Sequence, residues 1–429
     1  MTIAPQFFLS AMLFCAGLLA GSLAGAQPSP PPSVNETEAE NRWNEGDTAR
    51  ETRGDQGPLL EAALERYRDI ARRGGWGKFS ADVALGPPYS YNCDLIAALE
   101  KRLIREGYLR RGSTPPPPSP PVPGREKQTR PAPPPRSGPP LTQGGPCKYG
   151  PALTAAVKAF QSDRKILGDG QVGKRTRDEL NRPVEEIVEV LENDVERWRG
   201  FSHDPSGNYL LVNIPFFDLG VYAGGREKMR MQVIVGQKTW PTPRFSDEIE
   251  YIIVNPDWGI PDNIAKQEYW PHARRDANYL RRQGITATGG SLRQKPGPRN
   301  PLGRIKFVLP NEHDVYLHDT PEQRAFTAAV GALSHGCVRL SRPMDLANYL
   351  LRDDPAWSPS RLQSAIATGR TQQINLRRHM PVHIIYSTSR VNAEGRVEIR
   401  PDVYGKNRKR APREEDPAAP IDEAFQVGP

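Results

Sequence analysis

The periodicity of apolar residues changes near residue 209, and this change restricts the folds that the chain can adopt. Before it, CDLIAALEKRLIREGYL (93–109) and PVEEIVEVLENDVERW (183–198) repeat apolar residues at helical spacing. After it come short β-prone runs bounded by turn residues, including YLLVNIP (209–215), KMRMQVIVG (228–236) and EYIIVNP (250–256). The sequence therefore predicts a helical part followed by an antiparallel or mixed sheet. At 429 residues, the chain is long enough for two or three domains.

One cysteine and two histidines gather in residues 311–351. The β-prone run 315–317 places His318 at the end of a strand, and Ser334-His335-Gly336 is a turn-like approach to Cys337. A thiol with a pKa of about 8.5 needs a base or an imidazolium to react near neutral pH, and backbone N–H groups around Gly336 and Cys337 could donate to an oxyanion. Spacing alone leaves a cysteine nucleophile, a buried structural cysteine and a zinc site open, although the paired spacing of a closed zinc site is missing.

The residues around this motif resemble a known enzyme family. SHGCVRL, with the histidine of YLHDTP nineteen residues before its cysteine, is similar to the signature of the L,D-transpeptidases of bacterial cell walls. The resemblance spans about 208–404, including VNPDWGIPDNIAKQEYW (254–270), and is to the large multidomain type of Gram-negative bacteria. It implies a mainly β catalytic domain, a mixed sheet or sandwich, at 208–388. A helical cap at about 261–292 and a C-terminal strand segment at 389–404 are also implied.

The resemblance also implies roles for individual residues. Cys337 is expected to be the nucleophile and His318 the general base, oriented by Asp319 or by a nearby backbone carbonyl. Four further residues are expected to shape the pocket, hold a substrate carboxylate or position the loop: Ser334, His335, Gly336 and Arg339. Arg339 has an alternative, because it could simply pair with Asp345. Possible substrate-wall residues are Tyr316, Asn300 and Trp258. No cofactor and no metal is expected.

Residues 58–182 are predicted to form a helical scaffold and a small all-α peptidoglycan-binding domain. Phe160-Gln161 and the Asp-Gly-x-Val-Gly-x-x-Thr pattern at 169–176 resemble that domain, and an ordinary helical bundle is the alternative. Residues 114–141 interrupt it with a proline-rich segment, which has 13 prolines between residues 115 and 140. Such a segment favours extended polyproline conformations, so we interpret it as an insertion in a loop. Residues 183–207 are predicted to be a linker helix.

The cysteines outside the first 26 residues separate into a pair and a single thiol. Cys93 begins the first helix of the predicted binding domain, and Cys147 follows the proline-rich insertion. We predict a disulfide between them, which the oxidising periplasm permits. Closing a loop of this length is worth roughly 4 kcal/mol in the chain-entropy model. Cys337 is then left as the free thiol that a nucleophile requires.

The N-terminus predicts export. The apolar run 7–20 is short for a membrane span, and Ala24-Gly25-Ala26 offers a cleavage site, so residues 1–26 are predicted to be a signal peptide. No Lys or Arg precedes the run, and an uncleaved anchor is the alternative. Residues 27–57 and 405–429 are predicted to be a disordered tether and tail. The net charge of +8 suits an anionic cell envelope, and no nucleic-acid-binding motif is present.

The resemblance, together with the predicted export, implies a periplasmic cysteine acyltransferase whose partners are peptidoglycan stem peptides and glycan, with no nucleic acid. The expected activity is formation of 3-3 crosslinks through a cysteine thioester with the diaminopimelate carbonyl of a tetrapeptide stem. Water as the acceptor would make the protein an L,D-carboxypeptidase. A protein lysine would make it a tethering enzyme, or the hydrolase that reverses the tether. A wall-binding protein without catalysis is the remaining alternative.

Overall fold

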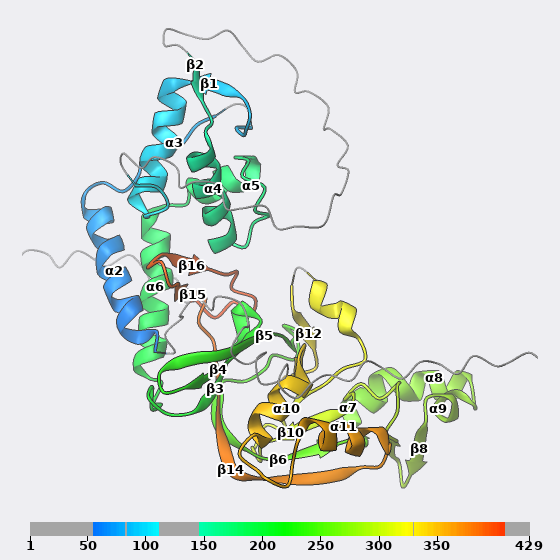
Figure 1. Ribbon diagram of the computed structural model, residues 1–429. Coiled ribbons are helices and arrows are strands. Elements are labelled where there is room, and N and C mark those ends of the chain that lie inside the picture. The colour runs from blue at the N-terminus through cyan, green and yellow to red at the C-terminus, as the bar shows by residue number, and fades with distance from the viewer. Residues whose placement is uncertain (1–54, 82–83, 111–145, 329, 408–429) are drawn as a thin grey trace, which may run out of the picture. The chain divides into compact units, whose positions relative to one another are not determined.

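The structure is a computed structural model that describes residues 55–81, 84–110, 146–328 and 330–407 (Figure 1). The predicted signal peptide, the proline-rich insertion and most of the predicted tether and tail lie outside these ranges, which include residues 55–57 of the tether and 405–407 of the tail. Within them, no helix combines the length and the apolar character needed to cross a membrane.

Residues 209–385 build a nine-stranded mixed sheet with the order β12-β5-β13-β11-β10-β6-β14-β3-β4. Strand β5 also pairs with β4, which closes eight of the strands into a ring and leaves β12 at the edge beside β5. The pairs β3–β14, β11–β13 and β5–β12 are parallel, and the other pairs are antiparallel. The mixed sheet predicted from the β-prone runs is therefore confirmed. The strands are β3 (Tyr209–Asn213), β4 (Asp218–Ala223), β5 (Arg226–Gly236), β6 (Phe245–Val254), β10 (Ile305–Val308), β11 (Leu317–His318), β12 (Ala332–Ser334), β13 (Val338–Leu340) and β14 (Gln372–Ile385).

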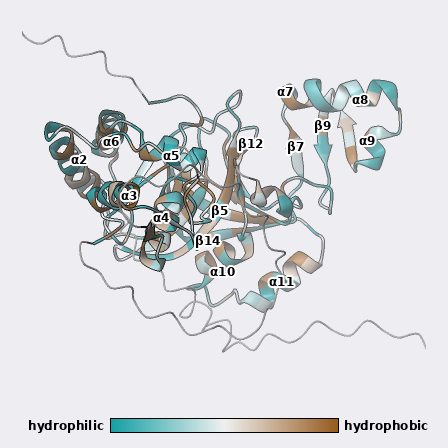
Figure 2. Ribbon diagram, turned by 90° about the horizontal axis from the view of Figure 1, so that it is seen from above, coloured by the Kyte–Doolittle hydropathy of each residue, from teal (hydrophilic) through white to brown (hydrophobic). Residues whose placement is uncertain are grey.

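Strand β3 shows why its sequence is apolar at every position. Leu210 and Val212 pack into the core of the nine-stranded sheet, whereas Tyr209 and Leu211 pack into a second core. Because successive side chains of a strand point to opposite faces, a strand covered on both faces reads as a continuous apolar run. Figure 2 shows the hydrophobic colour at β5, whose last four residues are all buried. The remaining elements of this region are η1 (Ile214–Phe216), η3 (Gln323–Thr327), α10 (Pro343–Leu351) and α11 (Pro359–Ala367).

The second core is built largely from two helices and a hairpin. Helix α2 (Gly57–Arg72) and helix α6 (Val184–Arg199) bury their apolar stripes together with residues of β3 and β4. The hairpin of β15 (Ser389–Val391) and β16 (Val397–Ile399) completes this core. Helix α2, which the sequence grouped with the predicted binding domain, thus shares its core with α6.

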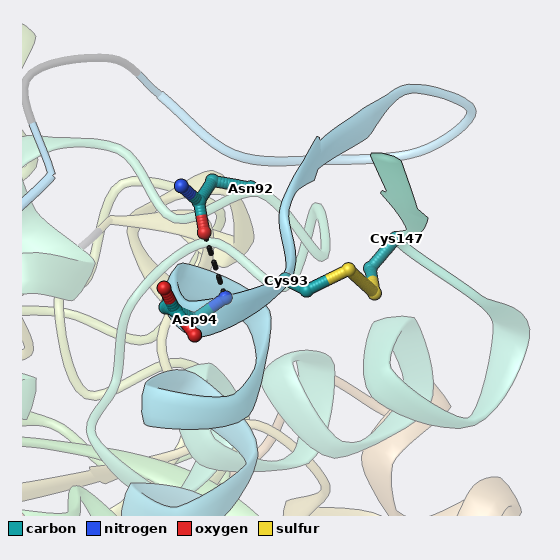
Figure 3. Close-up of a disulfide and its surroundings, with 4 residues drawn as sticks. All are labelled: Asn92, Cys93, Asp94 and Cys147. Carbon is teal, nitrogen blue, oxygen red and sulfur yellow. Dashed lines mark hydrogen bonds between the residues drawn. A yellow bond between two sulfur atoms is a disulfide. The ribbon is translucent and has the colours of Figure 1, made fainter. Parts of the chain in front are cut away.

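A third core contains helices α3 (Cys93–Arg105), α4 (Pro151–Asp163) and α5 (Lys174–Leu180), and we call this unit the three-helix module. Strands β1 (Ser90–Asn92) and β2 (Pro146–Lys148) pair antiparallel at its end. There, Cys93 and Cys147 form a disulfide with an S–S distance of 2.00 Å (Figure 3). The Asn92 side chain caps α3 by accepting a hydrogen bond from Asp94 N at 2.7 Å.

A buried cluster of charges joins the three-helix module to the second core. We call Glu106, Arg102, Arg164 and Tyr67 the Glu106 cluster. The Glu106 carboxylate accepts hydrogen bonds from both arginines and, at 2.7 Å, from the Tyr67 hydroxyl on α2. Arg164 Nη1 also donates to the Val397 carbonyl of β16 at 2.7 Å. The cluster therefore ties three helices and the C-terminal hairpin together.

The predicted helical cap at 261–292 is helical up to residue 282, and a hairpin that was not predicted follows at 285–294. Its elements are β7 (Trp258–Ile260), α7 (Asp262–Ile264), the π-helical turn η2 (Ala265–Tyr269), α8 (Trp270–Arg275), α9 (Tyr279–Arg282), β8 (Ile285–Thr288) and β9 (Ser291–Gln294). Strands β8 and β9 are joined by Gly289-Gly290, both with positive φ. A Gly-Gly pair between alternating residues is typical of a tight hairpin, and this signal identifies the missed strands.

Candidate active site

Strand register brings the candidate residues onto one face of the sheet. In the parallel pair β11–β13, Leu317 lies opposite Val338 and His318 opposite Arg339. Because side chains alternate along a strand, Leu317 and Val338 point into the core, where both are fully buried. The other face carries Tyr316, His318, Cys337 and Arg339. On this face Cys337 is the neighbour of Tyr316 and lies diagonal to His318.

The loop before β13 presents the thiol. Ser334 Oγ donates to the Cys337 carbonyl at 2.6 Å and accepts from the Gly336 N–H at 3.2 Å. Gly336 has φ +118°, a conformation that favours glycine, and the space where its Cβ would lie is open. Since the Gly336 N–H is already donated to Ser334, the expected oxyanion donors reduce to the Cys337 N–H, which has no hydrogen-bond acceptor among the described residues.

Cys337 is a free, partly buried thiol whose surroundings favour its neutral form. Burial raises the pKa of the Cys337 thiol, and this outweighs the opposing effects of the Tyr316 backbone and hydroxyl, Lys306 and Arg339. Sγ lies 3.8 Å from the Asp314 carbonyl, in the position of a weak S–H donor.

His318 is also neutral at rest. Its side chain is 4 % exposed, and burial, with Arg339 and Lys306 nearby, lowers its pKa to about 3 against the opposing effect of the Asp319 and Pro301 carbonyls. Nδ1 lies 2.5 Å from the Asp319 carbonyl oxygen. Because a carbonyl only accepts, Nδ1 carries the proton and Nε2 is the basic nitrogen. At physiological pH the imidazole is therefore unprotonated at Nε2, which is the form that a general base needs.

Asp319 acts through its backbone rather than its carboxylate. The carboxylate accepts from the backbone N–H groups of Arg304 at 2.8 Å and Thr320 at 2.7 Å, while the carbonyl contacts His318. Of the two orienting groups expected from the sequence, the structure therefore selects the carbonyl. The Asp319 carboxylate fixes the turn at residues 303–304, beside the histidine.

His335 and Arg339 each have a partner. His335 Nε2 lies 2.9 Å from a Glu268 carboxylate oxygen of the cap, and its ring packs on Trp240 with centroids 4.1 Å apart. Arg339 Nη1 lies 3.2 Å from Glu322, whereas Asp345 pairs with Arg342 at 2.6 Å. The alternative pairing of Arg339 with Asp345 is therefore wrong. Glu322 is exposed, so a substrate carboxylate could replace it at Arg339.

The three possible substrate-wall residues have different surroundings. Asn300 is 1 % exposed and donates to the Pro256 carbonyl at 2.9 Å, so it holds the turn that carries Pro301 rather than a wall. Trp258 packs in the core of the cap against Tyr269. Tyr316 lies between that core and the thiol, because its side chain packs against the cap and its hydroxyl contacts Cys337.

Sequence reasoning missed Lys306. It lies opposite His318 in the antiparallel pair β10–β11, and its Nζ lies 3.6 Å from the centroid of the Tyr316 ring. Burial lowers the pKa of Lys306, with the Cys337 site opposing this effect. A lysine in an alternating strand reads as solvent-facing, and only the pairing of β10 with β11 reveals its position. Across the described ranges, no group of three His, Cys, Asp or Glu side chains is arranged to hold a metal ion.

Comparison with protein families agrees with this geometry. Residues 207–371 match the YkuD family, described as the L,D-transpeptidase catalytic domain. A Haemophilus influenzae protein named "Putative L,D-transpeptidase" is 30% identical over 223 residues, which is 47% of this chain and 45% of the relative. The chain thus spans about half the length of the curated relative that it matches.

Solved structures with local similarity also carry this description. L,D-transpeptidase 3 from Mycobacterium tuberculosis is 15% identical, with 42% of this chain and 60% of that chain covered and a TM-score of 0.23. The catalytic domain of an L,D-transpeptidase from E. faecium, acylated by ertapenem, is 14% identical, with 43% and 100% covered and a TM-score of 0.23.

Proposed function

We propose that the protein is an L,D-transpeptidase that forms 3-3 crosslinks between peptidoglycan stems in the periplasm. The observation that carries the proposal is the shared sheet face of Cys337 and His318, inside a domain that matches the L,D-transpeptidase family. A neutral thiol beside a neutral, buried imidazole is suited to general-base activation at the moment of attack.

The proposed reaction has two halves. In the first, Cys337 Sγ attacks the carbonyl of the third stem residue, diaminopimelate, while His318 Nε2 takes the thiol proton. The carbon–nitrogen bond breaks, and the terminal D-alanine leaves with that proton. In the second half, the amine of another stem's diaminopimelate attacks the thioester, the carbon–sulfur bond breaks, and a proton of the amine returns to the Cys337 sulfur through His318. Because Sγ faces the Asp314 carbonyl, proton transfer requires it to turn towards His318. Hydrogen bonds between a catalytic base and its proton donor often tighten only when substrate is bound.

The remaining parts of the chain complete the proposal. Residues 58–182 would provide a peptidoglycan-binding domain, and a signal peptide at 1–26 would deliver the protein to the periplasm. Buried packing of Phe160, Leu180 and Val172 in the three-helix module supports a stable helical unit there. Gln161 binds the Asp169–Thr176 turn through three hydrogen bonds of 2.8–3.1 Å, which gives that sequence pattern a structural reason.

The test is mass spectrometry of products after incubation of the protein with purified disaccharide-tetrapeptide. Dimers joined between diaminopimelate residues, absent with Cys337→Ala, would support crosslinking and the nucleophile together. Tripeptide monomers alone would replace crosslinking by carboxypeptidase activity with the same thioester. Absence of both products from folded protein would contradict the proposal and favour a protein-lysine acceptor or a wall-binding role. The control variant is Arg342→Ala, which removes an exposed ion pair with Asp345 and leaves Cys337 unchanged.

A further inference from the structure

The loop that follows β5, the strand paired with β13, holds the carbonyl that precedes the nucleophile. Thr242 is 3 % exposed, and its hydroxyl donates to the Gly336 carbonyl at 2.7 Å while accepting from the Gly236 N–H at 2.8 Å. Gly236 is the last residue of β5. The hydroxyl therefore ties the end of a core strand directly to the loop that presents Cys337.

The C-terminal segment fixes this threonine in turn. The Tyr404 hydroxyl, on a side chain that is 7 % exposed, donates to the Gly236 carbonyl at 2.5 Å and accepts from the Thr242 N–H at 3.2 Å. Tyr404 N donates to the Tyr386 hydroxyl at 2.9 Å. The hydroxyls of Thr242 and Tyr404 thus each donate one hydrogen bond and accept another, so two hydrogen bonds determine the position of each hydroxyl.

We propose that Thr242 is a positioning residue for the oxyanion donor of this site and that Tyr404 supports it. The physical link is the Gly336–Cys337 peptide group, because in a planar trans peptide the C=O and the next N–H point in opposite directions. Holding the Gly336 carbonyl against Thr242 therefore aims the Cys337 N–H away from the loop. That N–H is the donor left available once Gly336 N has bonded to Ser334.

The inference deepens the proposed function, on which it rests for the meaning of the oxyanion. The family match ends at residue 371, and Tyr404 lies after it. The proposal therefore assigns a residue outside the matched region to the positioning of the oxyanion donor. A carbonyl attacked by Sγ becomes an oxyanion, and a donor that is already aimed costs no reorganisation in the transition state. An alkylating agent reacting at the same sulfur forms no oxyanion, so it does not need this donor.

That difference defines the experiment. Thr242→Val removes the hydroxyl at nearly constant volume, Thr242→Ser keeps it, and Thr371→Val is the matched control. The Thr371 hydroxyl makes a hydrogen bond of the same 2.7 Å length to the Asn255 carbonyl. For each full-length variant, acylation of Cys337 by a p-nitrophenyl ester and alkylation by iodoacetamide are timed by mass spectrometry of the Cys337 peptide, and kcat and KM are measured with disaccharide-tetrapeptide.

We expect Thr242→Val to slow ester acylation and lower kcat about tenfold, the scale of one lost hydrogen bond, with alkylation and KM within about twofold of wild type. Thr242→Ser and Thr371→Val should behave like wild type. Tyr404→Phe, which leaves the threonine hydroxyl in place, should give a smaller loss of about threefold in acylation, and it carries the test if Thr242→Val does not fold.

Equal rates of acylation in Thr242→Val and wild type would overturn the proposal, as would a parallel fall in acylation and alkylation. If the wild type shows no crosslinking but is still acylated by the ester, the proposed function fails and the role of Thr242 does not. Ester acylation tests the oxyanion donor without any peptidoglycan substrate.

Discussion

This molecule has two buried sites of ionisable groups, and the groups are charged in one site and neutral in the other. In the Glu106 cluster, burial raises the pKa of Glu106, but Arg164 and Arg102 outweigh it and hold that pKa below its ordinary value. At the candidate active site, burial prevails: the thiol pKa is raised and the His318 pKa falls to about 3. The difference lies in the partners. Glu106 meets guanidinium groups, whereas the partners of His318 are carbonyls, which do not compensate for a lost hydration shell.

The comparison separates stability from chemistry. A paired buried charge becomes costly when one partner is removed, because the other is left without compensation. A neutral buried acid–base pair carries little such cost and keeps its proton available for transfer when a reacting group arrives. Changes in the Glu106 cluster should therefore affect folding, and changes at the sheet face should affect reaction rate.

The largest expected effect is on catalysis. His318→Gln removes the neutral base while preserving a polar side chain of similar size, and we expect acylation of Cys337 to slow by about 10²–10⁴-fold. The rate of ester acylation, followed by mass spectrometry, measures this directly. His379→Gln changes an exposed histidine of β14 that pairs with Glu248 at 3.5 Å, and it should leave the rate unchanged. A His318→Gln rate close to that of wild type would exclude His318 as the base.

The next effect is on folding. Glu106→Gln leaves Arg102 and Arg164 buried without their counter-charge, and we expect a loss of about 3–5 kcal/mol in the free energy of unfolding in urea. Glu61→Gln is the matched control, because Glu61 pairs with Arg199 at 2.8 Å on the surface and should cost at most about 1 kcal/mol. Acylation rates per folded molecule should stay near wild type in both. Equal costs for the two variants would contradict the contrast between the sites.

Acid should remove the contributions of the two sites to the free energy of unfolding in different pH ranges. The folded pKa of His318 is depressed, so the unfolded chain takes up the proton first, near pH 6.5, and stability falls as the pH drops towards about 3. Glu106 also has a depressed pKa, so its contribution is complete above about pH 4.3 and is lost below that, as the pH falls through its folded pKa.

The difference between wild type and variant isolates each group. Between pH 6.5 and pH 4, we expect wild type to lose roughly 3 kcal/mol that His318→Gln does not lose, at about 1.4 kcal/mol per pKa unit. Glu106→Gln should differ from wild type in slope only below about pH 4.3. Urea unfolding at a series of pH values measures both, and parallel curves for wild type and His318→Gln above pH 4 would contradict a neutral, buried imidazole.

The parts of the site that sequence could predict are those set by neighbours along the chain. The β-prone run before His318 corresponds to β11. Lys306 and Thr242 reach the site only through strand pairing and through a loop contact across 94 residues, and no local pattern encodes such pairings. The same holds for the charge state of the thiol, because burial is a property of the folded chain and not of the SHGC motif.

The smallest expected effect tests how far the neighbours of the thiol moderate its pKa. Tyr316 opposes the rise of the Cys337 pKa through its hydroxyl, whereas its ring supports Lys306 and the cap. Tyr316→Phe removes only the hydroxyl, so the thiol pKa should rise further and alkylation by iodoacetamide at pH 8 should slow by about two- to fivefold, the scale of one hydrogen bond. Tyr349→Phe, on α10, should leave the rate unchanged. A faster reaction in Tyr316→Phe would contradict this expectation. It would show that the hydroxyl shields the sulfur more than it stabilises the thiolate.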